Sequence, residues 1–134
     1  MAIRITLVED SPADVYLLEE ALRAHGVAFE LDWIPDGEQA LTRLLRMPPG
    51  AQPHLILLDL NLPRVNGREL LSAIRRTPAL QHTRVAILTS SDPPTDRHDT
   101  EALGADCYIK KPPTLDEFLA TGRVIKELVS GVAL

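Results

Sequence analysis

Short apolar runs alternate with longer amphipathic segments along almost the whole chain. The run Leu55–Leu58 is apolar at every position, which is typical of a central parallel strand that is covered on both faces. Phe29–Ile34 alternates instead, so one face of that strand is expected to be less buried. Strands are therefore predicted at five places: Ile3–Val8, Phe29–Ile34, Leu55–Leu58, 85–88 and 107–109.

A helical segment follows each of these runs. In the first segment Ser11 is suited to cap a helix, Pro12 fits the first helical position, and Asp14 falls where the helix dipole favours an acid. Apolar residues then recur at helical spacing until Gly26. The other helices are predicted from Gly37 to about Met47 and at Gly67–Arg76, 95–103 and Leu115–Val129.

Five strand–helix repeats joined by short loops predict a doubly wound α/β sandwich. Crossovers between parallel strands are right-handed almost without exception, so the five-stranded sheet is expected to be parallel, with helices on both faces. A chain of 134 residues fits one domain, 1–134, without the help of disulfides or a structural metal. The sequence contains no internal repeat and no interdomain linker.

Composition narrows the function classes. The net charge of −5 and the scattered basic residues argue against a nucleic-acid surface, and the pair Arg75-Arg76 is interpreted as a solvated helix end. Apolar stretches of about four residues are far too short to span a membrane, and the amino terminus does not resemble a signal peptide. Cys107 has no partner for an intrachain disulfide, so it is expected to fill core space in a reduced, cytoplasmic setting.

Chemically active residues follow the predicted strands. Glu9 and Asp10 come after the first strand, Asp59 after the third, Thr89 after the fourth, and Lys111 after the fifth. The carboxyl ends of parallel strands share one edge of the sheet, where ligands of such folds bind. Each residue alone has a simpler explanation, as a helix-dipole acid, a turn former, a local cap or a solvated charge. Their occurrence together favours one common site.

Three neighbouring carboxylates require a cation, because each pair at roughly 4 Å repels by about 4 kcal/mol at an effective dielectric near 20. Hard oxygen ligands favour Mg²⁺ over zinc, and the four histidines show no ligand spacing. Such an ion, Lys111 and the Thr89 hydroxyl together suit the binding of a phosphoryl group. Asp59 is then the predicted nucleophile, forming an acyl phosphate.

At this point the sequence resembles the response-regulator receiver domains of bacterial two-component systems, from about residue 3 to residue 129. The resemblance rests on four segments: Leu7-Val8-Glu9-Asp10-Ser11, Leu57-Leu58-Asp59-Leu60-Asn61-Leu62-Pro63 with Gly67, Leu88-Thr89-Ser90, and Gly104-Ala105-Asp106 leading to Tyr108, Lys111 and Pro112. It implies a flavodoxin-like fold with strand order 2-1-3-4-5. It also implies a phosphoacceptor signalling protein, not an enzyme acting on an external substrate, that catalyses its own phosphorylation and dephosphorylation.

The same resemblance assigns roles to individual residues. Asp59 accepts the phosphoryl group from a sensor histidine kinase, and Mg²⁺ is held by Asp10, Asp59 and the backbone carbonyl of Asn61, with Glu9 acting through water. Lys111 contacts the phosphoryl group, and the peptide bond before Pro112 is the candidate for a cis bond. Two departures stand out: most receivers carry Asp at the position of Glu9, and Asn66 replaces a common Asp.

Thr89 and Tyr108 are expected to form a switch, in which phosphorylation draws the hydroxyl inward and the ring turns in behind it. The alternative for Tyr108 is an ordinary packing residue of an edge strand. In the last helix an apolar arc of about 220° exceeds the roughly 100° that core packing needs. It is interpreted either as a protein contact surface or as ordinary exposure, and its members are Leu115, Phe118, Leu119, Val124, Ile125, Leu128 and Val129.

Partners are implied by the resemblance alone. Strings such as Asp59-Leu60-Asn61-Leu62-Pro63 are most similar to single-domain regulators that partner bacterial phytochromes, so a bacteriophytochrome kinase is the leading candidate. No output domain is expected after the last helix, and the signal is expected to leave through the receiver surface, with a homodimer formed by the fourth helix, fifth strand and fifth helix. Two rivals are a haloacid-dehalogenase-like phosphatase, whose second Asp is Asn61 here, and a pseudo-receiver, which typically lacks one of the site residues.

Overall fold

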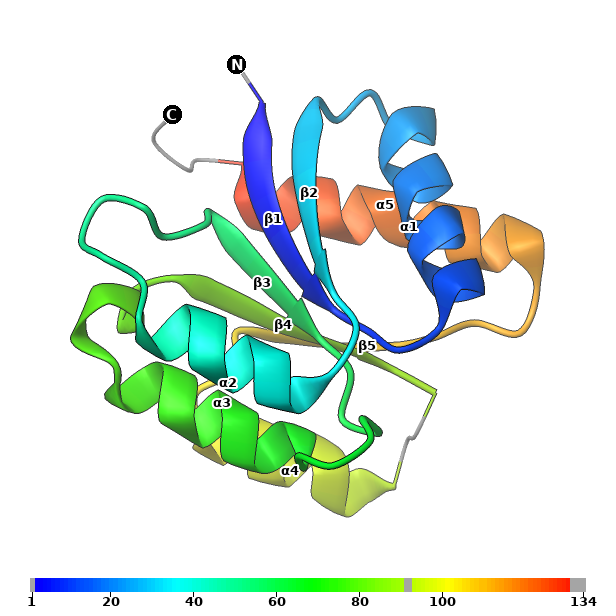
Figure 1. Ribbon diagram of the computed structural model, residues 1–134. Coiled ribbons are helices and arrows are strands. Elements are labelled where there is room, and N and C mark those ends of the chain that lie inside the picture. The colour runs from blue at the N-terminus through cyan, green and yellow to red at the C-terminus, as the bar shows by residue number, and fades with distance from the viewer. Residues whose placement is uncertain (1, 91–92, 131–134) are drawn as a thin grey trace.

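The computed structural model describes residues 2–90 and 93–130, and strands and helices alternate along it (Figure 1). Most element bounds agree with the sequence-based prediction within one or two residues, and a 3-10 turn at Pro78–Leu80 was not predicted. The strands are β1 (Ile3–Val8), β2 (Phe29–Ile34), β3 (Leu55–Leu58), β4 (Arg84–Thr89) and β5 (Cys107–Lys110). The helices are α1 (Pro12–Ala24), α2 (Gly37–Leu45), α3 (Gly67–Arg76), α4 (Pro94–Ala102) and α5 (Leu115–Val129).

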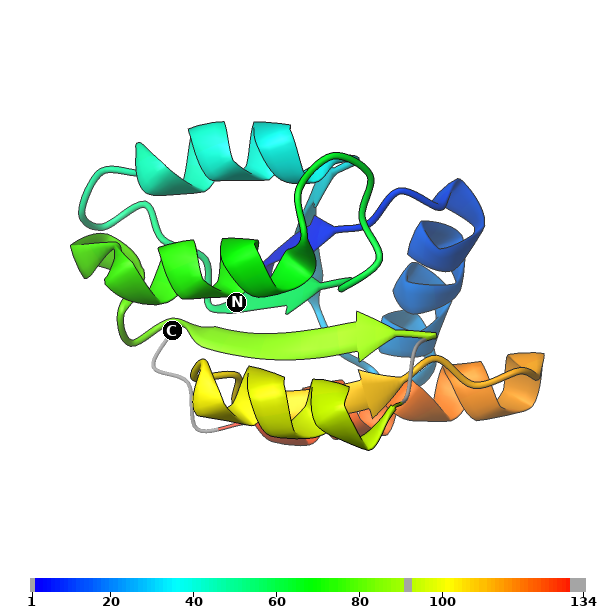
Figure 2. The ribbon, with the colours of Figure 1, turned by 90° about the horizontal axis from the view of Figure 1, so that it is seen from below.

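The five strands form one parallel sheet in the order β2-β1-β3-β4-β5, which confirms the predicted doubly wound topology. All four residues of the central strand β3 are buried. The arrowheads point the same way, and the loops that follow the strands gather at one end of the sheet (Figure 2). We call this end the carboxyl edge and the opposite end the amino edge.

The sheet separates two apolar cores. Helices α1 and α5 cover one face, and α2, α3 and α4 cover the other (Figure 1). Successive residues of β3 serve opposite cores, because side chains alternate across a strand: Leu55 and Leu57 face α1 and α5, whereas Ile56 and Leu58 face the other helices. Each of these buried side chains contributes about 1.5–3 kcal/mol of transfer free energy. Because both faces of β3 are covered, every position gains from an apolar residue, which explains the continuous apolar run in the sequence.

The apolar arc of α5 is used mostly for packing on α1 and the sheet. Phe118, Ile125 and Val129 are buried. The two helices approach closely at Gly122, where an added Cβ would lie 2.2 Å from the carbonyl oxygen of Ala21. Only a small part of the arc reaches the surface, chiefly Leu115, which is 58% exposed, and Val124, which is 40% exposed.

Strand β2 lies at an edge of the sheet and has the less buried face that its alternation predicts. Phe29 and Leu31 pack only partly against the α1 and α5 core, and Trp33 is 39% exposed. Cys107, on the other edge strand, is half-buried and packs against the same core, in agreement with its predicted role as filler.

Arg75 corrects one sequence-based interpretation. Only its neighbour Arg76 is exposed, as expected of a solvated helix end. The Arg75 guanidinium turns inward and donates to the carbonyls of Thr83 at 2.7 Å and Gly104 at 2.9 Å, and it pairs with Asp106 at 3.0 Å. The chain after α3 folds back over the end of this helix and supplies carbonyl groups there, a tertiary effect that local charge pattern does not reveal.

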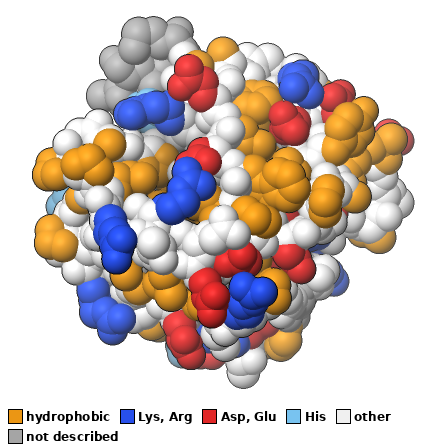
Figure 3. All heavy atoms as spheres, in the orientation of Figure 1, with side chains coloured by type: hydrophobic (Ala, Val, Ile, Leu, Met, Phe, Trp, Pro, Cys, Tyr) orange, Lys and Arg blue, Asp and Glu red, His pale blue; other side chains and the backbone are white. Residues whose placement is uncertain are grey.

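The molecular surface mixes side-chain types. On the face in Figure 3, acidic and basic side chains both occur, with apolar groups between them. Within residues 2–90 and 93–130, none of the helices combines the length and apolar character that crossing a bilayer demands.

Candidate functional site

The loop after β1 brings two acids to the carboxyl edge. Glu9 is buried, whereas Asp10 is exposed. The backbone of Glu9 is fixed at both ends, because its amide donates to the carbonyl of Ile34 at 3.1 Å and its carbonyl accepts the Trp33 indole N–H at 2.6 Å. The edge strand β2 therefore holds Glu9 in place.

Asp59 follows the central strand and is only 4% exposed. Its amide donates to the carbonyl of Val8 at 3.1 Å, and its Oδ1 accepts the backbone N–H of Asn61 at 3.0 Å. The loop then returns so closely that a Cβ at Gly67 would lie 2.8 Å from the Asp59 carbonyl oxygen and 2.6 Å from the Cα of Leu60. Only glycine fits this approach without displacing the backbone that carries Asp59.

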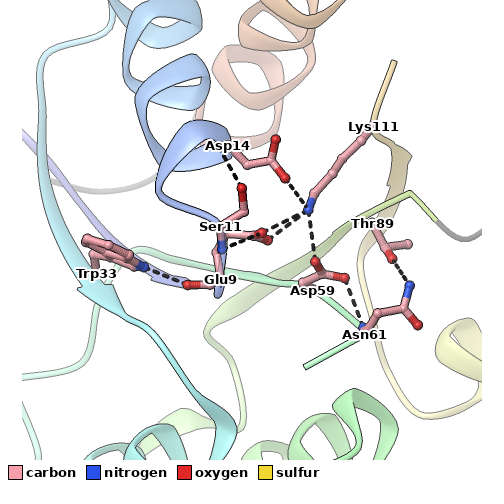
Figure 4. Close-up of polar contacts among 8 residues, drawn as sticks. All are labelled: Glu9, Ser11, Asp14, Trp33, Asp59, Asn61, Thr89 and Lys111. Atoms are coloured by element: carbon pink, nitrogen blue, oxygen red, sulfur yellow. Dashed lines mark hydrogen bonds and ion pairs between the residues drawn. The ribbon is translucent and has the colours of Figure 1, made fainter. Parts of the chain in front are cut away.

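Lys111 extends from the end of β5 into the middle of the acids (Figure 4). Its Nζ lies 2.9 Å from Asp59 Oδ2, 2.9 and 3.0 Å from the two Glu9 oxygens, and 2.8 Å from Asp14 Oδ2. The Lys111 side chain is 10% exposed, whereas the neighbouring Lys110 is exposed. The choice of Lys111 over Lys110 agrees with this geometry.

The peptide bond between Lys111 and Pro112 is trans, as is every peptide bond within the described ranges. The cis bond suggested by resemblance is therefore wrong for this structure. Lys111 reaches its carboxylate partners with a trans bond, which is the isomer ordinarily preferred by about 0.5–1 kcal/mol.

Thr89 ends the buried strand β4 beside these groups. Its side chain is buried, and its hydroxyl oxygen accepts a hydrogen bond from the Asn61 side-chain amide at 3.2 Å. Tyr108 lies on the adjacent strand β5, half-buried, with the Arg97 guanidinium 4.6 Å from its ring centroid. Thr89 is thus part of the site, and Tyr108 lies on the neighbouring strand under a basic side chain from α4.

The chemistry of the acids suits a divalent cation. Glu9, Asp10 and Asp59 each offer a carboxylate oxygen, and these oxygens lie within 4.8 Å of one another. This donor set is all oxygen and contains no thiolate or imidazole, and Asp10 lies open to water. These properties fit Mg²⁺, which retains water when protein carboxylates bind it.

Burial and hydrogen bonding shift the pKa values of Glu9 and Asp59 in opposite directions. Desolvation raises the pKa of Glu9 to about 8, although Lys111 opposes this. Burial alone would raise the pKa of Asp59 as well, but hydrogen bonds from the Asn61 amide and Lys111 outweigh it and lower this pKa. Burial would lower the pKa of Lys111, yet its carboxylate partners raise it. Without a metal, burial therefore favours the neutral form of Glu9, whereas the hydrogen bonds favour the charged forms of Asp59 and Lys111.

The structure brings Glu9, Asp10, Asp59 and Lys111 together, with Thr89 and Asn61 beside them. Sequence reasoning missed Asp14, which it interpreted only as a helix-dipole acid. A signal for its role was present, since Asp14 lies in the first turn after β1 and every such turn lies at the carboxyl edge.

Comparison with known proteins identifies the family. Residues 5–122 match the response regulator receiver domain family. Response regulator Rcp1 of Synechocystis sp. (strain ATCC 27184 / PCC 6803 / Kazusa) is 39% identical over 110 residues, which cover 80% of this chain and 75% of Rcp1. A crystal structure described as the Mn²⁺-bound form of response regulator Rcp1 is similar with a TM-score of 0.85 and 34% identity, covering 98% of each chain.

Two further solved structures are similar over all of this chain. One is the phosphorylated cyanobacterial phytochrome response regulator RcpA, with a TM-score of 0.87, 35% identity and 98% of that chain covered. The other is the bacteriophytochrome response regulator RtBRR, with a TM-score of 0.77, 33% identity and 81% of that chain covered. The family match, the relatives and the shared fold show that the chain belongs to the response regulator receiver domain family.

Proposed function

We propose that this single receiver domain accepts a phosphoryl group on Asp59 from a sensor histidine kinase in a Mg²⁺-dependent reaction. The observation that carries the proposal is the contact between Lys111 and Asp59 at 2.9 Å, next to the Glu9, Asp10 and Asp59 cluster. A negative group added to Asp59 would meet an ammonium group already directed at its carboxylate. This arrangement suits phosphoryl transfer, which depends on positioning and charge neutralisation.

In the proposed reaction a carboxylate oxygen of Asp59 attacks phosphorus. An acyl phosphate bond forms while the bond from phosphorus to the donor nitrogen breaks and the histidine leaves. Glu9, Asp10, Asp59 and the Asn61 carbonyl would hold Mg²⁺, which would neutralise phosphoryl charge. The Thr89 hydroxyl would donate to another phosphoryl oxygen. Water attack on the acyl phosphate would later restore Asp59, so the cycle is catalysed by the receiver itself.

Thr89 and Tyr108 are proposed to report the modification. Thr89 would exchange its present Asn61 contact for the phosphoryl group, and the Tyr108 ring would follow into the space left behind. The ring now lies under Arg97 on α4. The change would therefore reach the α4–β5–α5 surface, through which we infer that the signal leaves and a homodimer forms, with the exposed Leu115 and Val124 in support of a contact on α5.

The kinase partner is inferred from the relatives. Two similar structures are described as a cyanobacterial phytochrome response regulator and a bacteriophytochrome response regulator. A bacteriophytochrome kinase is therefore our leading candidate for the phosphoryl donor, and its site of action would be the cytoplasm.

The decisive experiment incubates the protein with acetyl phosphate and Mg²⁺ and follows intact mass. The parent protein is expected to gain one phosphoryl mass, which EDTA prevents. Asp59→Asn should gain none, because the amide is a poor nucleophile. Asp116→Asn, a change at an exposed acid of α5, is the matched control and should gain the same mass as the parent.

Two outcomes would contradict the proposal. Equal mass gain in Asp59→Asn and the parent would place the modification elsewhere, and no gain in the parent would favour a pseudo-receiver. Steady turnover of p-nitrophenyl phosphate without a stable phosphoprotein would instead favour the phosphatase rival.

A further inference from the structure

Asp14 is the third residue of α1, and its side chain makes a contact that interaction with the helix dipole does not require. The Ser11 hydroxyl accepts its backbone N–H at 3.3 Å, which is ordinary capping. Its carboxylate, however, turns toward the sheet and lies 2.8 Å from Lys111 Nζ, with its side chain 26% exposed (Figure 4).

Glu117 shows what the same helix position looks like without this contact. It is the third residue of α5, and its backbone N–H is capped by the Thr114 hydroxyl at 3.2 Å. Its side chain is exposed. Interaction with the helix dipole accounts for Glu117 and would equally account for an outward Asp14. The inward direction of Asp14 therefore needs another reason.

That reason lies in the three protons of the Lys111 ammonium group. Its acidic partners are Glu9, Asp14 and Asp59. Two of them, Glu9 and Asp59, also belong to the carboxylate cluster that suits a divalent cation, whereas Asp14 does not. A cation in that cluster would attract these two carboxylates and repel the ammonium group. Asp14 is the acid that remains for Lys111.

We propose that Asp14 is a positioning residue that keeps the Lys111 ammonium directed at Asp59 while a divalent cation occupies the Glu9, Asp10 and Asp59 cluster. The inference rests on the proposed function. Lys111 is long and loses about 2 kcal/mol of side-chain entropy when it is fixed. A charge-assisted hydrogen bond offsets this loss. Asp14 acts through Lys111 and does not touch the phosphoryl group.

The test compares Asp14→Ala with Glu117→Ala, which removes an acid from the same helix position. Phosphorylation by acetyl phosphate and Mg²⁺ is followed by intact mass over time. Asp14→Ala should be about tenfold slower, in line with the loss of one hydrogen bond to a charged group. Glu117→Ala should keep the parent rate. Asp14→Asn should fall between, since its amide oxygen accepts a hydrogen bond but carries no charge.

A second arm separates positioning from a structural effect on α1. In a Lys111→Met background, Asp14→Ala should cause no further slowing, because the group it positions is gone. ¹⁵N NMR of the Lys111 side chain in Mg²⁺ gives a readout apart from phosphorylation: its Nζ protons should be visible in the parent and lost to solvent exchange in Asp14→Ala. Denaturant unfolding identifies any variant that fails to fold, in which case Asp14→Asn decides.

The outcomes distinguish this inference from the proposed function. If the parent is phosphorylated at Asp59 and Asp14→Ala reacts at the parent rate, Asp14 has no positioning role and the proposed function stands. Equal slowing by Asp14→Ala with and without Lys111 would also overturn the inference. If the parent itself takes no phosphoryl group, both fail.

Discussion

Two half-buried cations lie at opposite edges of the sheet, and their partners differ in kind. At the carboxyl edge, Lys111 forms ion pairs with the side-chain carboxylates of Glu9, Asp14 and Asp59. At the amino edge, Arg75 donates mainly to backbone carbonyls, at Leu80, Gln81, Thr83 and Gly104, and pairs with one acid, Asp106. Both cations join elements that are far apart in the sequence.

This difference in partners determines which of the two cations can exchange its contacts. Carboxylates can turn toward a metal ion or receive a phosphoryl group, so the Lys111 contacts suit a site that alternates between states. Backbone carbonyls are fixed by the fold and have no such alternative. Asp106 also accepts the Val85 backbone N–H at 2.8 Å, which ties the Arg75 contacts to the start of β4. The Lys111 contacts at the carboxyl edge are therefore exchangeable, whereas the Arg75 contacts at the amino edge are permanent.

Among the variants that test this contrast, Arg75→Met is expected to change the free energy of unfolding most. It leaves several backbone carbonyls without their donor, and an acceptor left unsatisfied costs about 1–3 kcal/mol. The Asp106 side chain is 40% exposed, so loss of that ion pair adds little. The free energy of unfolding from urea titration should therefore fall by about 1–3 kcal/mol with or without Mg²⁺. Phosphorylation of the folded protein should stay at the parent rate, because Arg75 lies away from Asp59.

Lys111→Met is the matched comparison. Its loss of stability should shrink when Mg²⁺ is added, because a bound divalent cation then balances the same carboxylates. If Mg²⁺ restored both variants equally, or neither, the distinction between an exchangeable and a permanent cation would not hold.

The contacts of Lys111 could largely be predicted from the sequence, whereas those of Arg75 could not. Period-two and helical patterns predicted all five strands and helices, because each apolar residue needs a buried face. Glu9, Asp59, Thr89 and Lys111 were predicted to converge, because strand ends in a parallel sheet share an edge. The partners of Arg75 could not be foreseen, since backbone carbonyls of a returning chain leave no mark in residue type. Asp14 was missed for a related reason: an acid at a helix start already has a local explanation.

Glu9 should make the carboxyl edge sensitive to pH in the absence of metal. Its pKa is raised from 4.5 to about 8, so between these values the folded state holds a proton that the unfolded state has released. Stability therefore falls as pH rises, by about 2 kcal/mol between about pH 6 and pH 8 for a single group with such a shift. Urea titrations in EDTA across this range provide the measurement.

A control variant and the pH dependence of Mg²⁺ binding both test whether Glu9 is the titrating group. Glu9→Gln keeps the shape of the side chain without a titrating proton, and its stability should be nearly constant over the same range. Magnesium should bind the parent more tightly as pH rises, since binding to Glu9 displaces its proton, by at most about tenfold per pH unit. Stability of the metal-free parent that increased toward pH 8 would have the wrong sign and would remove Glu9 as the cause.

The two edges also differ in backbone conformation, with a smaller expected effect on stability. Three turns that lead from a helix into a strand, at the amino edge, each place a glycine at positive φ: Gly26 at 70°, Gly50 at 88° and Gly104 at 99°. At the carboxyl edge, the loop after β3 places Arg64 at φ 71° instead, where the Val65 amide donates to the Pro63 carbonyl at 2.9 Å. A residue with a Cβ is strained there by about 1–2 kcal/mol.

Arg64→Gly should relieve that strain and raise the free energy of unfolding by about 1 kcal/mol, after the extra entropy of glycine in the unfolded chain is subtracted. Arg64→Ala is the control, because it loses the same exposed contact with Glu38 but keeps a Cβ. That contact, at 3.5 Å between exposed groups, contributes little. The glycine variant should therefore unfold at higher urea than the alanine variant. Equal midpoints would mean that the loop carries no strain, and the two edges would then differ only in the partners of their cations.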